Sequence, residues 1–511
     1  MEEKNGMTVS RRAFLVSSTA LAVATAAGES GSATVFDGGH VIALARDMAA
    51  RRYRPRPQVP QDWIDLSYEQ YRSIWFRPTD ALWAGTDVPY EVDFFHPGLY
   101  FPRPVRVETV RDGMATPVGF DLSKFDRTDK FPDLTVDETL GYSGLRLRTE
   151  LTEPGKKNEF CVFQGASYFR AIGYDLIYGL SARGLALKTG DPTGEEFPDF
   201  TRFWLEEPRP DQKNIVVHAL MDSPSVTGAY RFDIKPGPDC VMDVQASLFP
   251  RTKLTHVGLG PLTSMFLYDQ TNRARFDDFR PAVHDSEGLM IWNGAGEVIW
   301  RPLANPNRLQ ISAFVDDGPR GFGLMQRARK YSDYDDLEAL YHKRPSIWVE
   351  PVGNWGAGAV TLVEIPADKE IYDNIVAYWR PRQALQAGRR HDVGYRLTWS
   401  ADVPVKTGVP RVVNSAMGAR HTGARELPGR IVTVDYEPHP VFDDGPEAMT
   451  IHVSSPHAET TKGVLQRNPE TGGLRLAFAF EPGARKMVEL RAQLRKNGKA
   501  ASEVWLYRWT A

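Results

Sequence analysis

Short extended segments separated by turn sequences dominate the chain from residue 93 onward, and this rhythm restricts the fold more than any other feature. Residues 228–233, the turn Pro-Gly-Pro-Asp at 236–239 and residues 240–248 have the pattern of one β-hairpin. Strands and helices do not alternate regularly, which disfavours a parallel α/β sheet. The 43 glycines and 37 prolines favour many turns. The sequence therefore predicts an all-β fold, with further strands at 214–221, 297–303, 309–315, 359–365 and 395–399 and two short helices at 41–52 and 68–75.

A domain boundary is expected at residues 401–410, where a strand runs into a segment rich in proline and glycine. In the remaining part, Leu474, Leu476, Phe478 and Phe480 alternate with other residues, which is typical of a strand buried on one face. The size and strand rhythm of this part are immunoglobulin-like. We therefore predict a large β domain over 34–404 and a smaller β-sandwich domain over 405–511.

The N-terminus carries an export signal. Residues 10–15 (Ser-Arg-Arg-Ala-Phe-Leu) match the twin-arginine pattern, and the weakly apolar run 14–27 ends in small residues. A membrane anchor is the alternative, but this run is shorter than the roughly 20 residues that a spanning helix needs. We predict a signal peptide over 1–30 that is cleaved near Ala26, export by the twin-arginine machinery, a periplasmic location and no membrane span in the mature protein.

The overall charge argues against one class of partner. The chain has 62 basic and 65 acidic residues, with a net charge of −3, so it has no chain-wide cationic field for nucleic acid or anionic lipid. We expect no nucleic-acid partner. Only Cys161 and Cys240 are present, so disulfides cannot form the framework of the fold. Two buried thiols are the preferred interpretation, and a single bridge is the alternative.

Standard catalytic motifs are absent from the sequence. There is no glycine-rich phosphate loop, no Gly-x-Ser-x-Gly elbow and no His-Glu-x-x-His among the eleven histidines. His452 and His457, five residues apart in a strand-to-loop region, are poorly spaced for a metal. We therefore expect no metal and no cofactor.

Two aspartates stand out by their surroundings. Asp285 lies in a polar connection, whereas Asp373 opens an otherwise apolar strand with aromatic neighbours. Apolar surroundings would raise the pKa of Asp373 and keep it protonated as a general acid, and a polar setting would leave Asp285 ionised as a base. On the residues alone, turn formation or capping explains both aspartates more simply. The tryptophans between 203 and 380 suit sugar stacking, but burial in a sandwich is the simpler explanation for each.

Several ordered blocks resemble the periplasmic glucan biosynthesis family OpgG/OpgD, also called MdoG/MdoD, and the twin-arginine signal is more similar to the OpgD branch. The resemblance runs from about residue 95 to 399 and is weaker in the last hundred residues. It implies a large galactose mutarotase-like β-sandwich followed by a smaller immunoglobulin-like β-sandwich domain. The matching blocks are FQGASYFR (163–170), YGLSARGLA (178–186), EFPDFT (196–201), SVTGAY (225–230), LTSMF (262–266), GFGL (321–324), KRPSIWVEP (343–351) and DNIV (373–376).

The resemblance also implies an activity. The family includes glycoside hydrolases that cut β-1,2-glucan internally with inversion, in which one carboxyl protonates the leaving oxygen and the other activates water. It implies that Asp373 is the general acid and Asp285 the general base. Candidate substrate-binding residues in the neighbouring segments are Tyr341, Arg344, Trp348, Trp379 and His284, and a buried structural role is the alternative for the first three.

The leading hypothesis is thus an inverting endo-β-1,2-glucanase in osmoregulated periplasmic glucan biosynthesis, with β-1,2-glucan as its partner. One alternative is a β-1,2-glucan transglycosylase that cyclises or branches the chain. Another is a non-catalytic periplasmic glucan-binding scaffold, because sandwich folds of this type also serve proteins that are not enzymes. A homodimer is compatible with the sequence.

Overall fold

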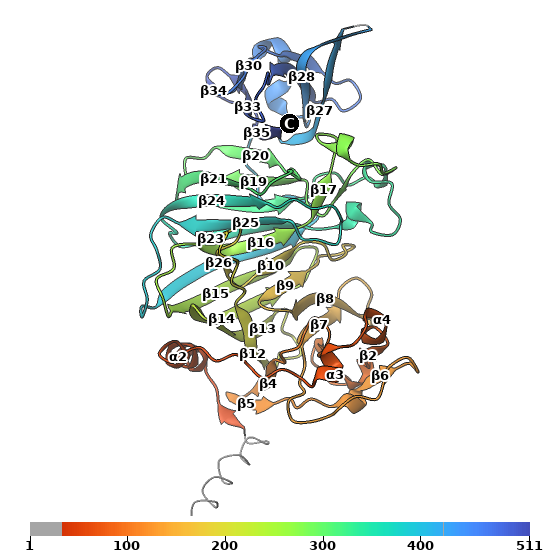
Figure 1. Ribbon diagram of the computed structural model, residues 1–511, viewed down its shortest axis with the longest axis vertical. Helices are drawn as coiled ribbons and strands as arrows, with labels where there is room; N and C mark the ends of the chain where they lie inside the picture. Colours follow the sequence, from red (N-terminus) through yellow and green to blue (C-terminus); the bar gives the residue numbers. More distant parts are fainter. Residues whose placement is uncertain (1–32, 423) are drawn as a thin grey trace, which may run out of the picture.

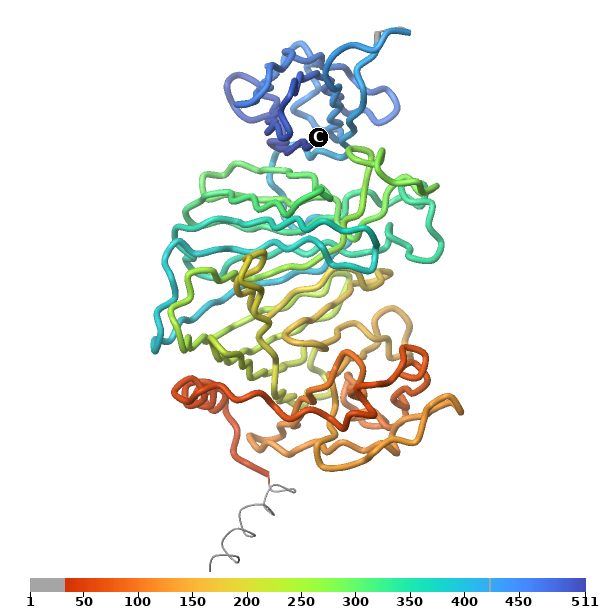
Figure 2. The backbone as a smooth tube through the Cα atoms, in the orientation of Figure 1, coloured from red at the N-terminus to blue at the C-terminus, as the bar shows by residue number. Residues whose placement is uncertain are grey.

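The computed structural model describes residues 33–422 and 424–511, and their secondary structure is mainly β-strand. This confirms the all-β prediction. The predicted signal peptide, 1–30, lies outside the described residues. None of the helices in the described part has the length and apolar character to cross a membrane. The N-terminal elements lie at one end of the long axis and the C-terminal strands at the other (Figure 1, Figure 2).

Helix α2 (Gly38–Ala49) begins slightly before the predicted segment, because Asp37 caps it by accepting a hydrogen bond from His40 N at 2.8 Å. The second predicted helix is shorter than expected. Helix α4 (Tyr68–Tyr71) has the predicted capping box, but the chain then enters strand β2, whose alternate residues are buried. The other helical turns are α3 (Gln61–Ile64), η1 (Pro78–Asp80), η2 (Leu122–Lys124), η3 (Arg273–Arg275), η4 (Tyr331–Asp333), η5 (Tyr341–Lys343), η6 (Pro440–Phe442) and η7 (Pro446–Ala448).

The first sheet, here called the large sheet, contains the predicted hairpin β14–β15. Its strands follow the order β1 (Thr34–Val35), β5 (Met114–Pro117), β4 (Arg106–Arg111), β12 (Asp199–Glu206), β13 (Ile215–Asp222), β14 (Val226–Lys235), β15 (Cys240–Pro250), β26 (His391–Ser400), β23 (Ser346–Val352), β22 (Gly321–Met325), β19 (Gly288–Trp292), β20 (Val298–Pro302), β35 (Val504–Thr510), β33 (Met487–Lys496) and β29 (Thr450–Ser454), and β34 (Lys499–Ala500) pairs with β33. Most neighbouring strands are antiparallel.

The second sheet packs on the large sheet. Its order is β21 (Gln310–Asp317), β24 (Ala357–Glu364), β25 (Ile375–Pro381), β16 (Val257–Ser264), β10 (Ser181–Arg183), β9 (Tyr168–Ala171), β8 (Lys157–Gln164), β7 (Gly144–Glu150) and β3 (Tyr90–Phe95), and β11 (Ala186–Leu187) pairs with β16. Rings from the two sheets meet between them. The Phe163 and Phe232 centroids are 5.2 Å apart, and those of Phe169 and Trp399 are 6.0 Å apart. The two sheets therefore form a sandwich with one shared core.

Smaller sheets complete the fold. They are β17 (Phe266–Tyr268) with β18 (Val283–His284), β2 (Ile74–Phe76) with β6 (Phe125–Arg127), and a C-terminal sheet of β27 (Val412–Thr422), β28 (Arg425–Tyr436), β32 (Leu474–Glu481), β30 (Glu459–Thr460) and β31 (Val464–Arg467). The β17–β18 pair carries Asp285, one of the two candidate aspartates, at its end.

The C-terminal strands continue the large sheet. Strand β35 runs parallel to β20, where Trp300 is paired with Trp505. The same two tryptophans belong to an apolar cluster that includes Trp348 and residues of β28 and β32. Strands on both sides of residue 404 thus share one sheet and one cluster, and the division into 34–404 and 405–511 stays a prediction.

Cys161 and Cys240 are both buried free thiols. Burial raises the pKa of each thiol, that of Cys240 to about 12, so neither forms a thiolate readily. These cysteines act as small apolar residues of the core.

Candidate active site

Asp285 follows strand β18 directly and is almost completely buried, with 6% of its surface exposed. Its backbone N–H donates to the carbonyl of Met265 at 2.9 Å. Met265 precedes β17, the partner of β18. The aspartate is therefore fixed at the end of a short two-stranded ribbon.

The carboxyl of Asp285 lies beside a cation. Arg344 Nη1 is 3.4 Å from Asp285 Oδ1, but Oδ1 accepts no hydrogen bond from a protein group, so this guanidinium acts on it through charge. Burial raises the pKa of the Asp285 carboxyl to about 6; Arg344 opposes the shift and the negative charge of Asp373 adds to it.

Asp373 precedes strand β25 and is about one-third exposed in its side chain. Arg170 Nη2, from β9, lies 3.6 Å from Asp373 Oδ2. The next residue, Asn374, is buried, and its Nδ2 donates to the carbonyls of Phe266 at 2.9 Å and Ile365 at 3.0 Å. Its Oδ1 accepts from Phe266 N at 2.8 Å.

The two aspartates are thus anchored to adjacent residues. Met265 holds the backbone of Asp285, and Phe266 holds the side chain of Asn374 beside Asp373. Acids 88 positions apart in the sequence are brought into one electrostatic neighbourhood, in which Asp373 and Arg170 both shift the pKa of Asp285.

The environments of the two aspartates are the reverse of those expected from sequence. Asp285, predicted in a polar setting, is the buried one. The apolar neighbours expected to surround Asp373 do not bury it, because Ile371 and Tyr372 point to solvent, with 75% and 50% of their surfaces exposed.

Arg344 and Tyr341 lie beside Asp285, and their predicted place in one wall of a glucan cleft stays a prediction. Arg344 is held by hydrogen bonds to the carbonyls of Tyr178 and Ala339, at 2.6 Å from Nη1 and 2.9 Å from Nη2. Its guanidinium carbon is 5.3 Å from the centre of the Tyr341 ring. The Tyr341 hydroxyl donates to Glu370 Oε2 at 2.7 Å. Tyr341 is buried, so it supports the wall rather than lining it.

Gln326 joins the segments that carry Asp285 and Arg344. Its Nε2 donates to the carbonyls of His284 at 2.9 Å and Tyr341 at 3.1 Å. Its Oε1 is 2.9 Å from His284 Nδ1. One buried carboxamide therefore fixes the backbone just before Asp285 and the turn that leads to Arg344.

Three of the predicted substrate-binding residues are buried in the protein interior. Trp379 is 0% exposed in the core between the sheets, and Trp348 is 1% exposed in the C-terminal apolar cluster. His284 is 2% exposed, stacks on Phe266 with centroids 5.4 Å apart, and bonds to Gln326. None of these side chains offers a face to a glucan, so we do not propose them as contacts.

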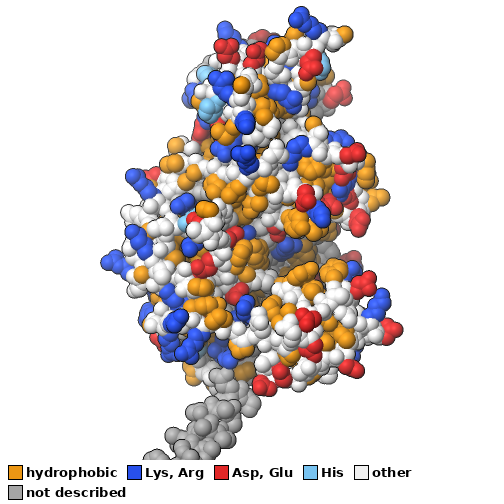
Figure 3. Space-filling view, in the orientation of Figure 1, with side chains coloured by type: hydrophobic (Ala, Val, Ile, Leu, Met, Phe, Trp, Pro, Cys, Tyr) orange, Lys and Arg blue, Asp and Glu red, His pale blue; other side chains and the backbone are white. Residues whose placement is uncertain are grey.

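A hollow of about 520 Å³ adjoins Asp373. In Figure 3 the molecule is notched on the right, on the side of β8 and β9. The hollow combines ring faces with polar groups, as sugar binding requires. The main side chains that line it are Phe95, Phe101, Gln164, Tyr168, Arg170 and Asp373.

Sequence reasoning did not select Arg170, Tyr168, Gln326 or Glu370. Arg170 and Tyr168 end one of the blocks that carry the family resemblance, which was the available signal. Gln326 and Glu370 left no local signal, because their partners lie on other loops.

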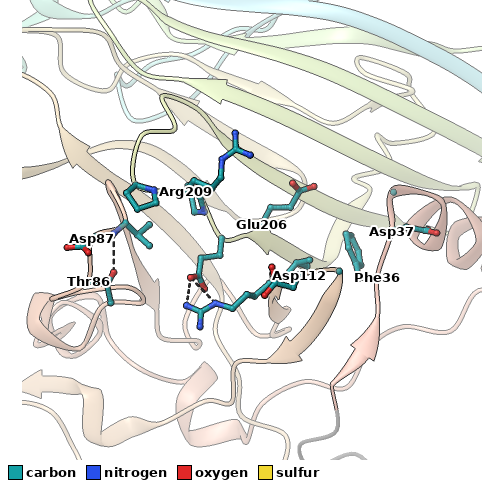
Figure 4. Close-up of a pocket in the computed structure, with 15 residues that line it drawn as sticks. Phe36, Asp37, Thr86, Asp87, Asp112, Glu206 and Arg209 are labelled. Atoms are coloured by element: carbon teal, nitrogen blue, oxygen red, sulfur yellow. Dashed lines mark hydrogen bonds and ion pairs between the residues drawn. The ribbon is translucent and has the colours of Figure 1, made fainter.

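Another hollow lies beside the start of α2 and is less suited to acid–base chemistry (Figure 4). Its two glutamates have partners: Glu207 pairs with Arg111, and Glu206 Oε1 is 2.6 Å from His218 Nε2. Within residues 33–422 and 424–511, no group of three or more His, Cys, Asp or Glu side chains is arranged to hold a metal ion.

Comparison with known proteins gives a consistent result. The family model described as "Periplasmic glucan biosynthesis protein, MdoG" matches residues 36–509. A "Glucans biosynthesis protein G" of Vibrio cholerae is 47% identical over 481 residues, which cover 93% of this chain and 87% of that protein. A protein of the same name from Shewanella sp. (strain MR-4) is 47% identical over 476 residues, with the same coverage. Both relatives carry the G name, and the similarity to the OpgD branch stays a prediction.

Proposed function

This chain belongs to the MdoG family of periplasmic glucan biosynthesis proteins, and from that membership we propose that it is an inverting endo-β-1,2-glucanase. In this proposal Asp373 is the general acid and Asp285 the general base. The observation that carries the proposal is the anchoring of both aspartates to the adjacent residues Met265 and Phe266, with a guanidinium beside each carboxyl.

The surroundings of Asp285 suit a base. With a pKa of about 6, its carboxyl is mainly ionised near pH 7 yet accepts a proton more readily than an exposed aspartate. Its Oδ1 is buried and has no hydrogen-bond donor from the protein, so a water that reaches it when substrate binds would find a free acceptor. Arg344 keeps the carboxylate charged and in place without occupying that oxygen through a hydrogen bond.

The position of Asp373 suits a general acid that acts once a glucan chain occupies the hollow. Its carboxyl borders the aromatic hollow and is partly open to solvent. A glucan chain in the hollow would lie against this carboxyl. Arg170, whose Nη2 is 3.6 Å from Asp373 Oδ2, lines the same hollow.

Purified protein incubated with linear β-1,2-glucan provides the test. We expect shorter glucans with new reducing ends, and the first product seen by NMR should be the α-anomer, because inversion changes the configuration of the β-linkage. Cyclic or branched products without new reducing ends would instead identify a transglycosylase. Binding of glucan without any change in chain length would identify a scaffold.

We also propose the twin-arginine route of export, supported by the arginine pair at 11 and 12. Replacing both with lysine in the full-length precursor should leave it uncleaved in the cytoplasm. Normal processing of that variant would contradict this route.

A further inference from the structure

Exposed basic side chains are concentrated where α2 ends and two loops lie beside it. The members of this group, here called the basic face, come from three separate parts of the sequence. They are Arg46, Arg51, Arg52, Lys253, Arg389 and Arg390.

Hydrogen bonds bring these parts together. The guanidinium of Arg251 donates to the carbonyls of Met48 at 2.9 Å and Arg51 at 3.1 Å, which places the segment of Lys253 against the end of α2. Gly388 N donates to the carbonyl of Pro250 at 2.9 Å, and Leu254 pairs with Leu385. The loop that carries Arg389 is therefore fixed beside the same segment.

Few acidic groups neutralise this face. Asp392 Oδ1 accepts from Arg390 Nε at 2.7 Å, and Arg251 itself pairs with Asp222 at 2.8 Å. Asp47 is the exposed acid on the last turns of α2. In the part of the chain that the structure describes, no carboxylate pairs with Arg51, Arg52, Lys253 or Arg389.

The charge of the chain is thus unevenly distributed. A net charge of −3 over the sequence conceals a local excess of positive charge. Figure 3 shows Lys and Arg side chains gathered at the lower left, where α2 lies in Figure 1. The sequence-wide argument against anionic lipid therefore does not apply to this surface.

We propose that the basic face binds the surface of a bilayer that contains anionic lipids. The hollow at the candidate site and the hollow beside the start of α2 do not include these residues. A set of cations spread over three segments matches many separate phosphates better than it matches one small ligand. Each Lys or Arg close to an anionic leaflet adds to the electrostatic attraction, and several together give measurable binding at moderate salt.

Binding through the basic face leaves the candidate active site open. In Figure 1, α2 lies on the left, whereas β9 and β17, beside the aspartates, lie toward the right. The proposal goes beyond glucan chemistry, because it requires neither Asp285 nor Asp373. It places the protein at the membrane surface with its cleft facing away.

Sedimentation with vesicles tests the proposal on the full mature chain. We expect binding to vesicles of phosphatidylglycerol mixed with phosphatidylcholine, and much weaker binding to phosphatidylcholine alone or at high salt. The double variant Arg51→Glu/Arg52→Glu should weaken binding about tenfold or more. Lys462→Glu/Lys486→Glu, which changes two exposed lysines of the C-terminal sheet region by the same charge, is the matched control and should bind like the native protein.

Several outcomes would overturn the proposal. They are equal binding to both kinds of vesicle, no binding to either, and equal losses in the two double variants. Because the readout is sedimentation, a protein without glucanase activity could still confirm it. A folded state is checked by equal melting temperatures of the variants.

Discussion

Asn374 binds both backbone polar groups of Phe266, donating to its carbonyl at 2.9 Å and accepting from its N–H at 2.8 Å. The side chain acts as a strand partner for a residue at the start of β17, in the ribbon that carries Asp285. The loop of Asp373 therefore cannot move independently of Asp285 without breaking buried hydrogen bonds.

Asn374→Ala tests this coupling. The change removes three side-chain hydrogen bonds and leaves buried backbone groups of Phe266 and Ile365 without partners, so we expect a loss of about 2–4 kcal/mol in unfolding free energy. We also expect kcat to fall at least tenfold. Asn354→Ala, in an exposed loop where the side chain accepts from Gly356 N at 2.7 Å, is the control. Native stability and turnover in Asn374→Ala would contradict the coupling.

Substitution of each aspartate separates the two proposed roles. Asp373→Asn should lose hydrolysis of β-1,2-glucan by at least a thousandfold but retain it on an oligosaccharide with a dinitrophenyl leaving group, which needs no acid. Asp285→Asn should lose both, because the attacking water then has no base. Kinetics on the two substrates give the answer. Asp368→Asn, an exposed acid of the same loop, should change neither, and the opposite pattern would exchange the roles.

The raised pKa of Asp285 predicts how stability changes with pH. Its folded pKa of about 6 lies above the ordinary value of 3.8, so the folded state binds the proton more tightly than the unfolded state. Between about pH 4 and pH 6 the unfolded chain loses this proton first, and the native protein loses about 2–3 kcal/mol of stability as pH rises.

Asp285→Asn removes that dependence. We expect the variant to melt at a higher temperature than the native protein at pH 7 and at a similar temperature at pH 4. The activity of the native enzyme should fall as pH decreases through about 6, because the base becomes protonated. Thermal unfolding over this pH range and a kcat/KM profile provide the measurements. A difference in melting temperature that is the same at both pH values would contradict the burial of an ionisable carboxyl.

Much of the fold could be predicted because its signals are local. The hairpin β14–β15 follows from the strand pattern on either side of a Pro-Gly-Pro-Asp turn. The strand residues and the turn residues lie within a few positions of one another in the sequence, so a local reading finds both. The short extent of α4 could not be predicted, because it depends on the pairing of β2 with the distant β6.

The candidate site was less predictable, because it too depends on contacts between residues that are distant in the sequence. Trp379 lies on β25 only a few residues after Asp373, but Asp373 stands before that strand begins, so strand alternation does not relate the two side chains, and Trp379 faces the core. The burial of Asp285 and the role of Gln326 depend on contacts across loops, which spacing does not reveal. The family resemblance located the two aspartates, but not their environments.

Gln326→Met tests whether the carboxamide positions Asp285. Methionine has similar volume but removes the hydrogen bonds to His284 and Tyr341. We expect kcat to fall about tenfold or more with little change in KM. The acid limb of the pH profile should move toward lower pH as the segment of Asp285 gains access to water.

Gln493→Met is the matched control, because Gln493 is also buried but lies on β33, away from both aspartates. We expect it to lower stability without changing the pH profile. If the two variants alter turnover and the acid limb equally, Gln326 has only a general structural role.

The ion pair between Arg327 and Glu503 predicts that the C-terminal strands stabilise the main sandwich. Both oxygens of Glu503 are 2.7 Å from Arg327 nitrogens, Glu503 is fully buried, and the guanidinium carbon is 3.6 Å from the centre of the Trp300 ring. Glu503 Oε2 also accepts from Val412 N at 2.8 Å, in the first strand after the expected boundary. Arg327 directly follows Gln326, so this pair also restrains the carboxamide beside Asp285.

Glu503→Gln leaves a buried guanidinium without its counter-charge, and we expect it to lower the unfolding free energy by about 3–5 kcal/mol. The double variant Arg327→Met/Glu503→Leu should be more stable than Glu503→Gln, because it removes both charges. Glu489→Gln, which breaks the partly exposed pair with Arg508 at 2.5 Å, should change stability by no more than about 1 kcal/mol. Chemical denaturation of the four proteins tests this prediction: a double variant no more stable than Glu503→Gln would mean that the pair is not a coupled, buried link between the C-terminal strands and the segment that holds Asp285.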